Sequence, residues 1–369
     1  MGNDNHDNDG GAGVSDEEWR RFQEDAAAGT GPALREPSAR ARMVTERLRA
    51  TQGQEPPGWR TGPALQGRRR PGRLGAAVAV VLIAGLALIA LRPELVIDRI
   101  TGKADARQEA KSAAPLPAET ARPTAAPGAV PPDQPTLAEP FRGSPALRWA
   151  DGAAGIEVPE ATAVGGLTKE QVADGLAKAK QFLVAANLDP ATLRGERPAA
   201  ALAILDPQQS EDFQGVERSL THPNAEDDPT HLFTRFDPAE VKPVGGVVKV
   251  RGSMRVEPGE PGEVRVATDY TFVHPMTKGD TSVQRTIVRR QITFSVLDPA
   301  RWKATGDRLQ LSEYHVESSN VECESTRGYL HPQFPQDAPT GPAPTGPATD
   351  PYDRSQDIKG GACGTVTRS

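Results

Sequence analysis

The longest apolar stretch of the chain runs from Leu74 to Leu91 and contains no charged residue. A helix of that length spans roughly 27 Å, which is about the thickness of the hydrocarbon core of a bilayer. A helix buried in a soluble domain normally keeps a polar face, and this stretch has none. About seventy residues precede it, too many for a cleaved signal peptide. We therefore expect an uncleaved transmembrane helix over residues 74–91.

Basic residues set the expected orientation of this helix. They crowd its N-terminal flank: Arg68, Arg69, Arg70 and Arg73. The C-terminal flank has fewer basic residues, and these are mixed with acids. Because positive flanks stay in the cytoplasm, we expect a single-pass plasma-membrane protein with a cytoplasmic N-terminus and an extracytoplasmic C-terminal domain.

The two cysteines of the chain, Cys323 and Cys363, both follow the expected span. An even pair confined to one side of a membrane favours a disulfide bond in an oxidising compartment. Two free thiols are the alternative. The pair thus agrees with the orientation that the arginines predict.

Three segments have the composition of flexible chain. Residues 1–73 form a net-basic arm, in which a capping box at Ser15–Glu18 and a segment near Ser38–Arg49 predict short helices. Three interpretations of these segments are open: marginal helices on a disordered arm, a surface helix on anionic lipid, or a docking peptide for a cytosolic partner. Residues 92–165 predict a Pro/Ala-rich stalk, and residues 326–369 a Pro/Gly-rich tail.

Between the stalk and the tail the hydrophobic pattern first has a helical period. Thr168 and Gln171 form another capping box, and apolar residues follow at helical spacing as far as Ala186. Short helices are expected after Asp189 and again from Asp206 to Phe213. The pattern predicts helices at the start of this domain.

The period then changes from 3.6 to 2, which is typical of half-buried strands. The alternation predicts four strands: Val248–Val256, Glu263–Val273, Val283–Val296 and a last one near Leu309–Val316. It falters at Arg289 and Arg290, where we expect a β-bulge. Helices followed by an antiparallel meander indicate an α+β domain over residues 166–325, with the helices packed on a four-stranded sheet.

Composition limits the amount of folded chain. With 36 glycines, 35 prolines and 5% aromatic residues among 369, only one sizeable core is expected. The net charge of −6 gives no indication of nucleic-acid binding. Lys249, Arg251 and Arg255, with Arg265 and Arg289, predict a basic sheet face, which is either plainly solvated or in contact with an anionic envelope polymer. No motif for a metal or a cofactor is present.

Two parts of the chain resemble known groups of proteins. Residues 15–100, through Glu36–Leu48, Pro57–Ala64 and the arginine-flanked span, resemble uncharacterised Streptomyces single-pass membrane proteins. Residues 168–320, through their element order and the hairpin Val296–Lys303, resemble the nuclear-transport-factor-two-like, cystatin-like family. The first resemblance implies an actinobacterial plasma-membrane protein. The second implies helices wrapped on a curved four-stranded sheet.

Some members of that fold are isomerases or dehydratases with an Asp or His base and a Tyr in the cone of the sheet. The corresponding candidates here are Asp269, Tyr270, His274, Tyr314 and His315. Spacing does not place any two of them in one pocket, because neighbours along a strand, such as Asp269 and Tyr270, point to opposite faces.

The sequence favours a non-enzymatic, membrane-anchored envelope protein with an extracytoplasmic interaction domain. Its expected partners are the lipid bilayer and an envelope protein or cell-wall polymer, with no nucleic acid and no cofactor. The alternative is a transmembrane, anti-sigma-like regulator that signals through the arm. A third hypothesis is an isomerase or hydrolase in the outer domain. The oligomeric state is left open.

Overall fold

The computed structural model describes residues 113–130, 133–279, 282–323, 327–338, 343–359 and 363–369, with seven helical positions of the arm between Glu17 and Glu46. The expected span at 74–91 and its flanking arginines, Arg68, Arg69, Arg70 and Arg73, lie outside the described residues. None of the helices in the described ranges is long and apolar enough to cross a bilayer.

Helices precede most of the strands, as the pattern predicts. They are η1 Pro145–Arg148, η2 Gly152–Gly155, α6 Lys169–Asn187, α7 Pro190–Leu193, α8 Ala199–Leu202, α9 Ser210–Thr221 and η3 Pro229–His231. The capping box of α6 is confirmed: the Thr168 hydroxyl accepts the N–H of Gln171, and the Gln171 side chain accepts the N–H of Thr168. Helix α9 starts later and is longer than the helix predicted from Asp206 to Phe213.

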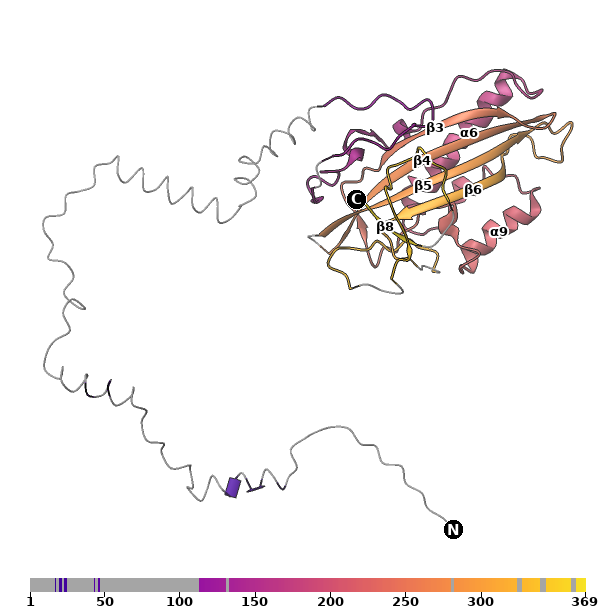
Figure 1. Ribbon diagram of the computed structural model, residues 1–369. Coiled ribbons are helices and arrows are strands. Elements are labelled where there is room, and N and C mark those ends of the chain that lie inside the picture. Colours follow the sequence, from indigo (N-terminus) through magenta and orange to yellow (C-terminus); the bar gives the residue numbers. More distant parts are fainter. Residues whose placement is uncertain are drawn as a thin grey trace, which may run out of the picture. The chain divides into compact units, whose positions relative to one another are not determined.

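The strands form one antiparallel sheet in the order β1-β3-β4-β5-β6, with β2 paired to β4 (Figure 1). They are β1 Ala150–Asp151, β2 Lys242–Pro243, β3 Lys249–Pro258, β4 Glu263–Lys278, β5 Ser282–Leu297 and β6 Gln310–Ser319. Two more strands, β7 Gly346–Thr349 and β8 Gly364–Val366, pair in parallel within the tail. The α+β class is therefore confirmed, and β3 to β6 are the four predicted strands.

The predicted bulge at Arg289 and Arg290 is wrong. The register of β4 against β5 is continuous through both residues, and the register of β5 against β6 shifts between Thr293 and Phe294. Successive residues of a strand face opposite sides of a sheet. The alternation falters at the two arginines because both are buried, one on each face. A regular strand can thus lose its hydrophobic alternation without a bulge.

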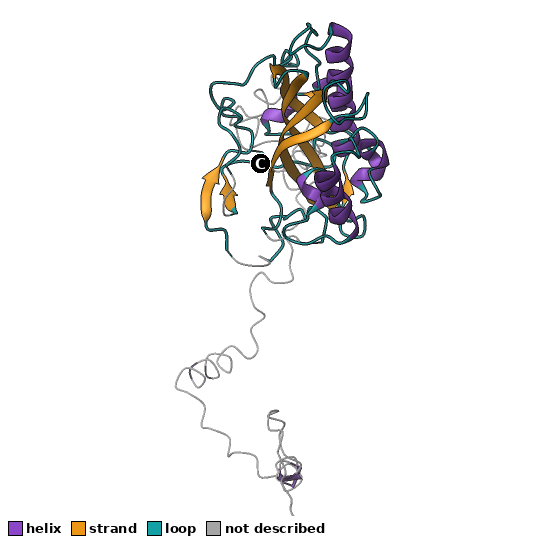
Figure 2. Ribbon diagram, turned by 90° about the vertical axis from the view of Figure 1, so that its right-hand side faces the viewer, coloured by secondary structure: helices purple, strands orange, loops and turns teal. Residues whose placement is uncertain are grey.

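The main core lies between the helices and one face of the sheet, which we call the helix face. Figure 2 shows the α-helices gathered on one side of the strands, with loops and a two-stranded sheet on the other. Leu176 and Leu183 of α6 pack with Tyr270, Phe272 and residues of similar size from β3 to β5. Burial of such side chains contributes about 1.5–3 kcal/mol each relative to exposure, so this face anchors the fold.

The opposite side of the sheet, which we call the outer face, is also covered. Phe141 and Trp149 from the predicted stalk and Tyr352 from the predicted tail pack on Val273 and Ile287. The folded part is thus wider than the predicted 166–325. The stalk and tail compositions mislead because a few large apolar anchors attach long Pro-rich stretches to the sheet. Proline has no N–H to leave unpaired where it lies against a surface.

A disulfide bond joins Cys323 to Cys363, as the sequence predicts. The Cα atoms are 5.5 Å apart, and the two cysteines are separated by 40 positions. Cys323 follows β6, while Cys363 lies beside β8. The bond therefore fastens the tail to the end of the main sheet.

Candidate functional site

Buried ion pairs occupy the centre of the outer face. Arg289 on β5 donates from Nε and Nη2 to the two carboxylate oxygens of Asp269 on β4, at 2.9 and 2.8 Å. Both side chains are almost completely buried. Arg289 also donates to the backbone carbonyls of Asp353 at 3.2 Å and Gln356 at 2.8 Å. One guanidinium thus binds the sheet and the tail together, through charge-assisted hydrogen bonds.

A second group, which we call the Glu119 triad, lies beside this pair and consists of Glu119, Arg251 and Arg354. Oε2 of Glu119 accepts from Nε of Arg251 at 2.8 Å and from Nη2 of Arg354. Its other oxygen, Oε1, is buried without a hydrogen-bond partner among the described residues, and so is Nε of Arg354. One carboxylate oxygen therefore serves two arginines, while two buried polar atoms of the group remain unsatisfied.

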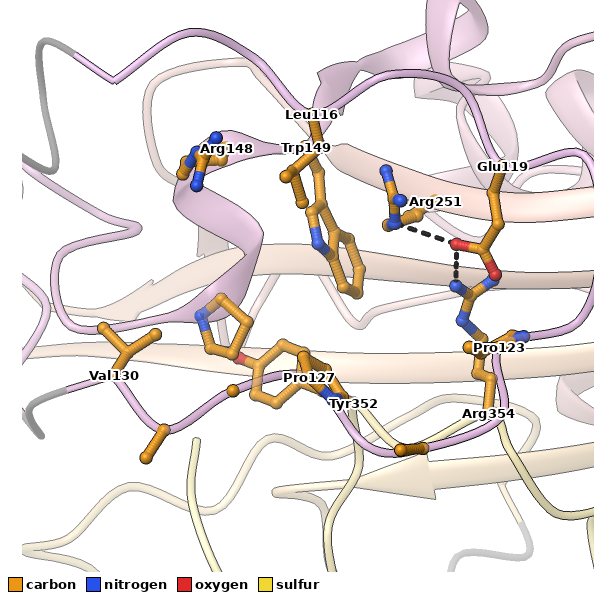
Figure 3. A pocket seen from close by; sticks show the side chains of 14 residues that line it. Leu116, Glu119, Pro123, Pro127, Val130, Arg148, Trp149, Arg251, Tyr352 and Arg354 are labelled. Atoms are coloured by element: carbon orange, nitrogen blue, oxygen red, sulfur yellow. Dashed lines mark hydrogen bonds and ion pairs between the residues drawn. The ribbon is translucent and has the colours of Figure 1, made fainter.

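The Glu119 triad forms one wall of a pocket of about 490 Å³, which we call the Glu119 pocket (Figure 3). This volume lies within the range of small-molecule sites. The pocket is lined by residues of the Pro-rich segment, the sheet and the tail: Leu116, Glu119, Pro123, Ala125, Pro127, Gly128, Ala129, Val130, Pro145, Arg148, Trp149, Arg251, Tyr352 and Arg354. The rings of Trp149 and Tyr352 pack edge to face, with their centroids 5.6 Å apart. Most of the lining is apolar.

The charges in the pocket are unequal. Three arginines, Arg148, Arg251 and Arg354, face a single acid, Glu119. Nε of Arg148 donates to the carbonyl of Ala114 at 3.1 Å, and this arginine has no carboxylate partner among the described residues. The rest of the chain after the expected span is net acidic. A positive pocket in an acidic domain favours an anion, because both the Coulomb attraction and the fixed N–H donors select for negative oxygen atoms.

Desolvation makes an anion more important to this pocket. Burial lowers the pKa of the Arg251 guanidinium, and the nearby Glu119 carboxylate opposes that shift. A buried arginine normally needs a paired anion, since an uncompensated charge out of water is costly. The pocket contains three arginines and only one acid, so its positive charge is not fully balanced by its own residues.

The structure does not bring the five acid–base candidates together. Asp269 lies on the outer face with Arg289, whereas Tyr270 and His274 lie on the helix face. The opposite directions expected for Asp269 and Tyr270 are confirmed. The Tyr270 hydroxyl donates to the carbonyl of Glu157 at 3.2 Å. The last two candidates, Tyr314 and His315, are exposed on β6.

His274 has the most perturbed environment of these candidates. It is buried between the rings of Phe236 and Phe272, and its Nε2 has no hydrogen-bond partner in the part of the chain that the structure describes. Burial, with a smaller contribution from the nearby Arg290 cation, lowers the pKa of His274 to about 3. Its imidazole is therefore neutral in the fold at neutral and mildly acidic pH.

This pKa predicts acid lability. Between pH 6.5, the ordinary value for histidine, and pH 3, the unfolded chain binds a proton at residue 274 that the folded chain does not. The free energy of unfolding should fall with decreasing pH in that window, by up to about 1.4 kcal/mol per pH unit from this residue. His274→Leu should flatten the dependence. Urea titrations from pH 7 to pH 4 measure it, and equal slopes for both proteins would contradict the assignment.

The predicted basic face is only partly exposed. Lys249 lies over the ring of Phe141 and donates to the carbonyl of Trp149 at 3.0 Å, and Arg251 and Arg289 are covered by the Pro-rich segment and the tail. The two others at the far end, Arg255 and Arg265, have side chains about half exposed. The open arginine surface is thus smaller than the alternation suggests, and one of the covered residues, Arg251, lines the pocket.

Sequence reasoning missed Glu119, Arg148 and Arg354, since they lie in segments with linker composition. A signal was available for Glu119, which is a charged residue in a stretch otherwise rich in Pro and Ala, whereas Arg354 stands among other charged residues. Within the described ranges, no cluster of His, Cys, Asp or Glu is arranged to hold a metal ion. No protein-family model, curated protein or solved structure matches this chain. The two family resemblances therefore stay predictions.

Proposed function

We propose that this chain is a non-enzymatic, single-pass envelope protein whose extracytoplasmic unit binds a partner at the Glu119 pocket. The observation that carries the proposal is the pocket itself: the Pro-rich segment, the sheet and the tail each contribute part of its lining, and its arginines outnumber its acid three to one. Three distant parts of the chain are thus combined into one cationic, largely apolar concavity.

The chemistry of the lining supports binding rather than proton transfer. Guanidinium groups stay protonated at neutral pH and act as fixed donors to anions. The pocket contains three of them and no histidine or cysteine among its lining residues. Such a lining holds an anionic partner and orients it.

The disulfide supports an extracytoplasmic address for this unit. Disulfides persist in oxidising compartments and are rare in the cytosol. The bond between Cys323 and Cys363 lies in the part of the chain after the predicted span. The arginines before the span favour the same orientation. In this proposal the Pro-rich segment positions the pocket at the membrane's outer side.

The topology has a direct test. Alkaline phosphatase, which is active only outside the cytosol, is fused after Ser369, and a second fusion is placed before residue 68 in a truncated chain. We expect activity from the first fusion and none from the second. The reverse pattern would place the pocket in the cytoplasm and overturn the proposed location.

Binding at the pocket is tested by site-specific crosslinking in native membranes. A photoreactive residue replaces Ala129, an exposed lining residue, and in a matched control it replaces Ala300, which is exposed in the loop after β5. We expect an adduct from position 129 that is absent from position 300 and is reduced by Arg148→Gln. Identification of the adduct tells a protein from a cell-wall polymer. Equal labelling from both positions would reject the pocket as the binding site.

A further inference from the structure

The Glu119 triad differs from a stable structural ion pair. In a well-formed pair of this kind, an arginine and a carboxylate exchange two parallel hydrogen bonds, as Arg289 and Asp269 do. In the triad both arginines share Oε2 of Glu119, and Oε1 has no partner. Nε of Arg354 is also buried without a partner. The donors of the two arginines therefore exceed what this single carboxylate satisfies.

The three members of the triad come from segments with different attachments. Arg251 lies on β3, next to the short edge strand β1, whereas Arg354 lies in the tail that the disulfide fastens. Glu119 lies in the Pro-rich segment, where the N–H of Leu116 donates to the carbonyl of Arg148 and the carbonyl of Pro117 accepts from Nη1 of Arg251. Figure 3 shows the Glu119 carboxylate between the two guanidiniums. The anion is thus on a segment without helix or strand, whereas Arg251 lies on a strand of the sheet.

From this geometry we infer that Arg251 and Arg354 form an oxyanion subsite of the pocket, and that Glu119 occupies it as an internal competitor. A ligand bearing a phosphate or carboxylate group displaces Glu119, and its apolar part lies against the proline and alanine residues of the lining. This inference rests on the proposed binding function and names the chemistry of the partner. A second oxyanion oxygen satisfies the donor that Glu119 leaves unpaired.

Competition gives the subsite a built-in control. A tethered carboxylate competes at a high effective concentration, so an external anion binds only when its apolar contacts add to its charge. Simple inorganic anions are then rejected, whereas an amphipathic phosphate or carboxylate is accepted. Binding also frees residues near Glu119 from the sheet, which couples occupancy to the segment that leads to the membrane.

The test uses the full chain in nanodiscs of zwitterionic lipid and isothermal titration with three probes: butyl phosphate, butyrate and butanol. We expect Glu119→Gln to bind butyl phosphate at least about tenfold more tightly than the unmodified chain, because the internal competitor is gone. Adding Arg251→Gln to that variant should abolish binding. The phosphate and carboxylate probes distinguish the two sources of the oxyanion.

A matched control removes an acid elsewhere. Glu257 pairs with Arg255 at 2.5 Å, both side chains being about half exposed, and Glu257→Gln changes the net charge by the same amount. It should leave the affinity for butyl phosphate unchanged. An equal gain in affinity for butyl phosphate in this control would overturn the inference, since the net charge of the protein would then explain the binding. Equal affinity for butanol would overturn it too, since the apolar lining alone would then explain the binding.

A second measurement does not depend on the stability of the variant. In the unmodified chain, saturating butyl phosphate should increase amide hydrogen exchange in residues 113–130 and leave exchange in α6 unchanged. Unchanged exchange in both segments would overturn displacement of Glu119. If the probes fail while crosslinking at position 129 persists, the oxyanion subsite is wrong and the binding function stands. If the phosphatase fusion after Ser369 is inactive while the probes bind, the extracytoplasmic location is wrong and the oxyanion subsite stands.

Discussion

Asp269→Asn should lower the free energy of unfolding by about 3 kcal/mol, because it leaves the Arg289 guanidinium buried without its carboxylate. The substitution keeps the shape of the side chain and removes only its charge. Arg289 also holds the tail carbonyls of Asp353 and Gln356, so the loss should extend to the contact between sheet and tail. Urea titration followed by tryptophan fluorescence measures the change.

Exposure of the pair decides the size of this effect. The control is again Glu257→Gln, which breaks a partly exposed ion pair and should cost at most about 1 kcal/mol. The double variant Asp269→Leu with Arg289→Met should cost less than the sum of the two single changes, since neither charge is then left alone. Additive costs would show that the two side chains act independently and would contradict the assignment.

Cys363→Ser should lower the free energy of unfolding by about 4 kcal/mol in the chain-entropy model, because the bond closes a loop spanning 40 positions. The tail would be expected to loosen first. Its remaining attachments are hydrogen bonds such as that from Arg285 to the carbonyl of Ser369 at 2.5 Å. Amide exchange in residues 343–359 should therefore rise before any change in α6.

The partner cysteine provides the control for this prediction. Cys323→Ser, the double variant and the reduced unmodified chain should all match Cys363→Ser, since each removes the same crosslink. A reduced chain that unfolds at the same urea concentration as the oxidised chain would show that the disulfide contributes no stability. A double variant with a lower free energy of unfolding than either single variant would point to separate packing roles for the two side chains.

Local patterns accounted for much of the observed fold. The capping box at Thr168 depends on residues three positions apart, and the alternation of β3 to β5 depends on residues two apart. Such short-range rules are visible in one sequence. The rules failed at Arg289 and Arg290, where each buried arginine has its partners far away in the chain. Arg290, for example, donates to Asn187 on α6 at 2.8 Å.

The candidate site was beyond the reach of those rules. Glu119 meets Arg354 across 235 positions, and both lie in stretches whose composition predicts a linker. Composition measures how much apolar surface a stretch can bury on average, and here a few residues such as Leu116 and Tyr352 do most of that burying. An average over composition does not reveal a few apolar residues that attach a stretch to the sheet.

The sequence by itself determined the α+β class and the order of the main helices and strands, and it left a single possible disulfide pairing, because the chain has two cysteines. The structure decided between that bond and two free thiols. The sequence also makes the arginine-flanked span at 74–91 the firmest expectation for residues that the structure does not describe. Only the tertiary structure decided that the Pro-rich segment and the tail cover the outer face and enclose a cationic pocket. The reason is physical: hydrophobic period and capping are local properties of the chain, whereas ion pairing between distant segments depends on where folding brings them.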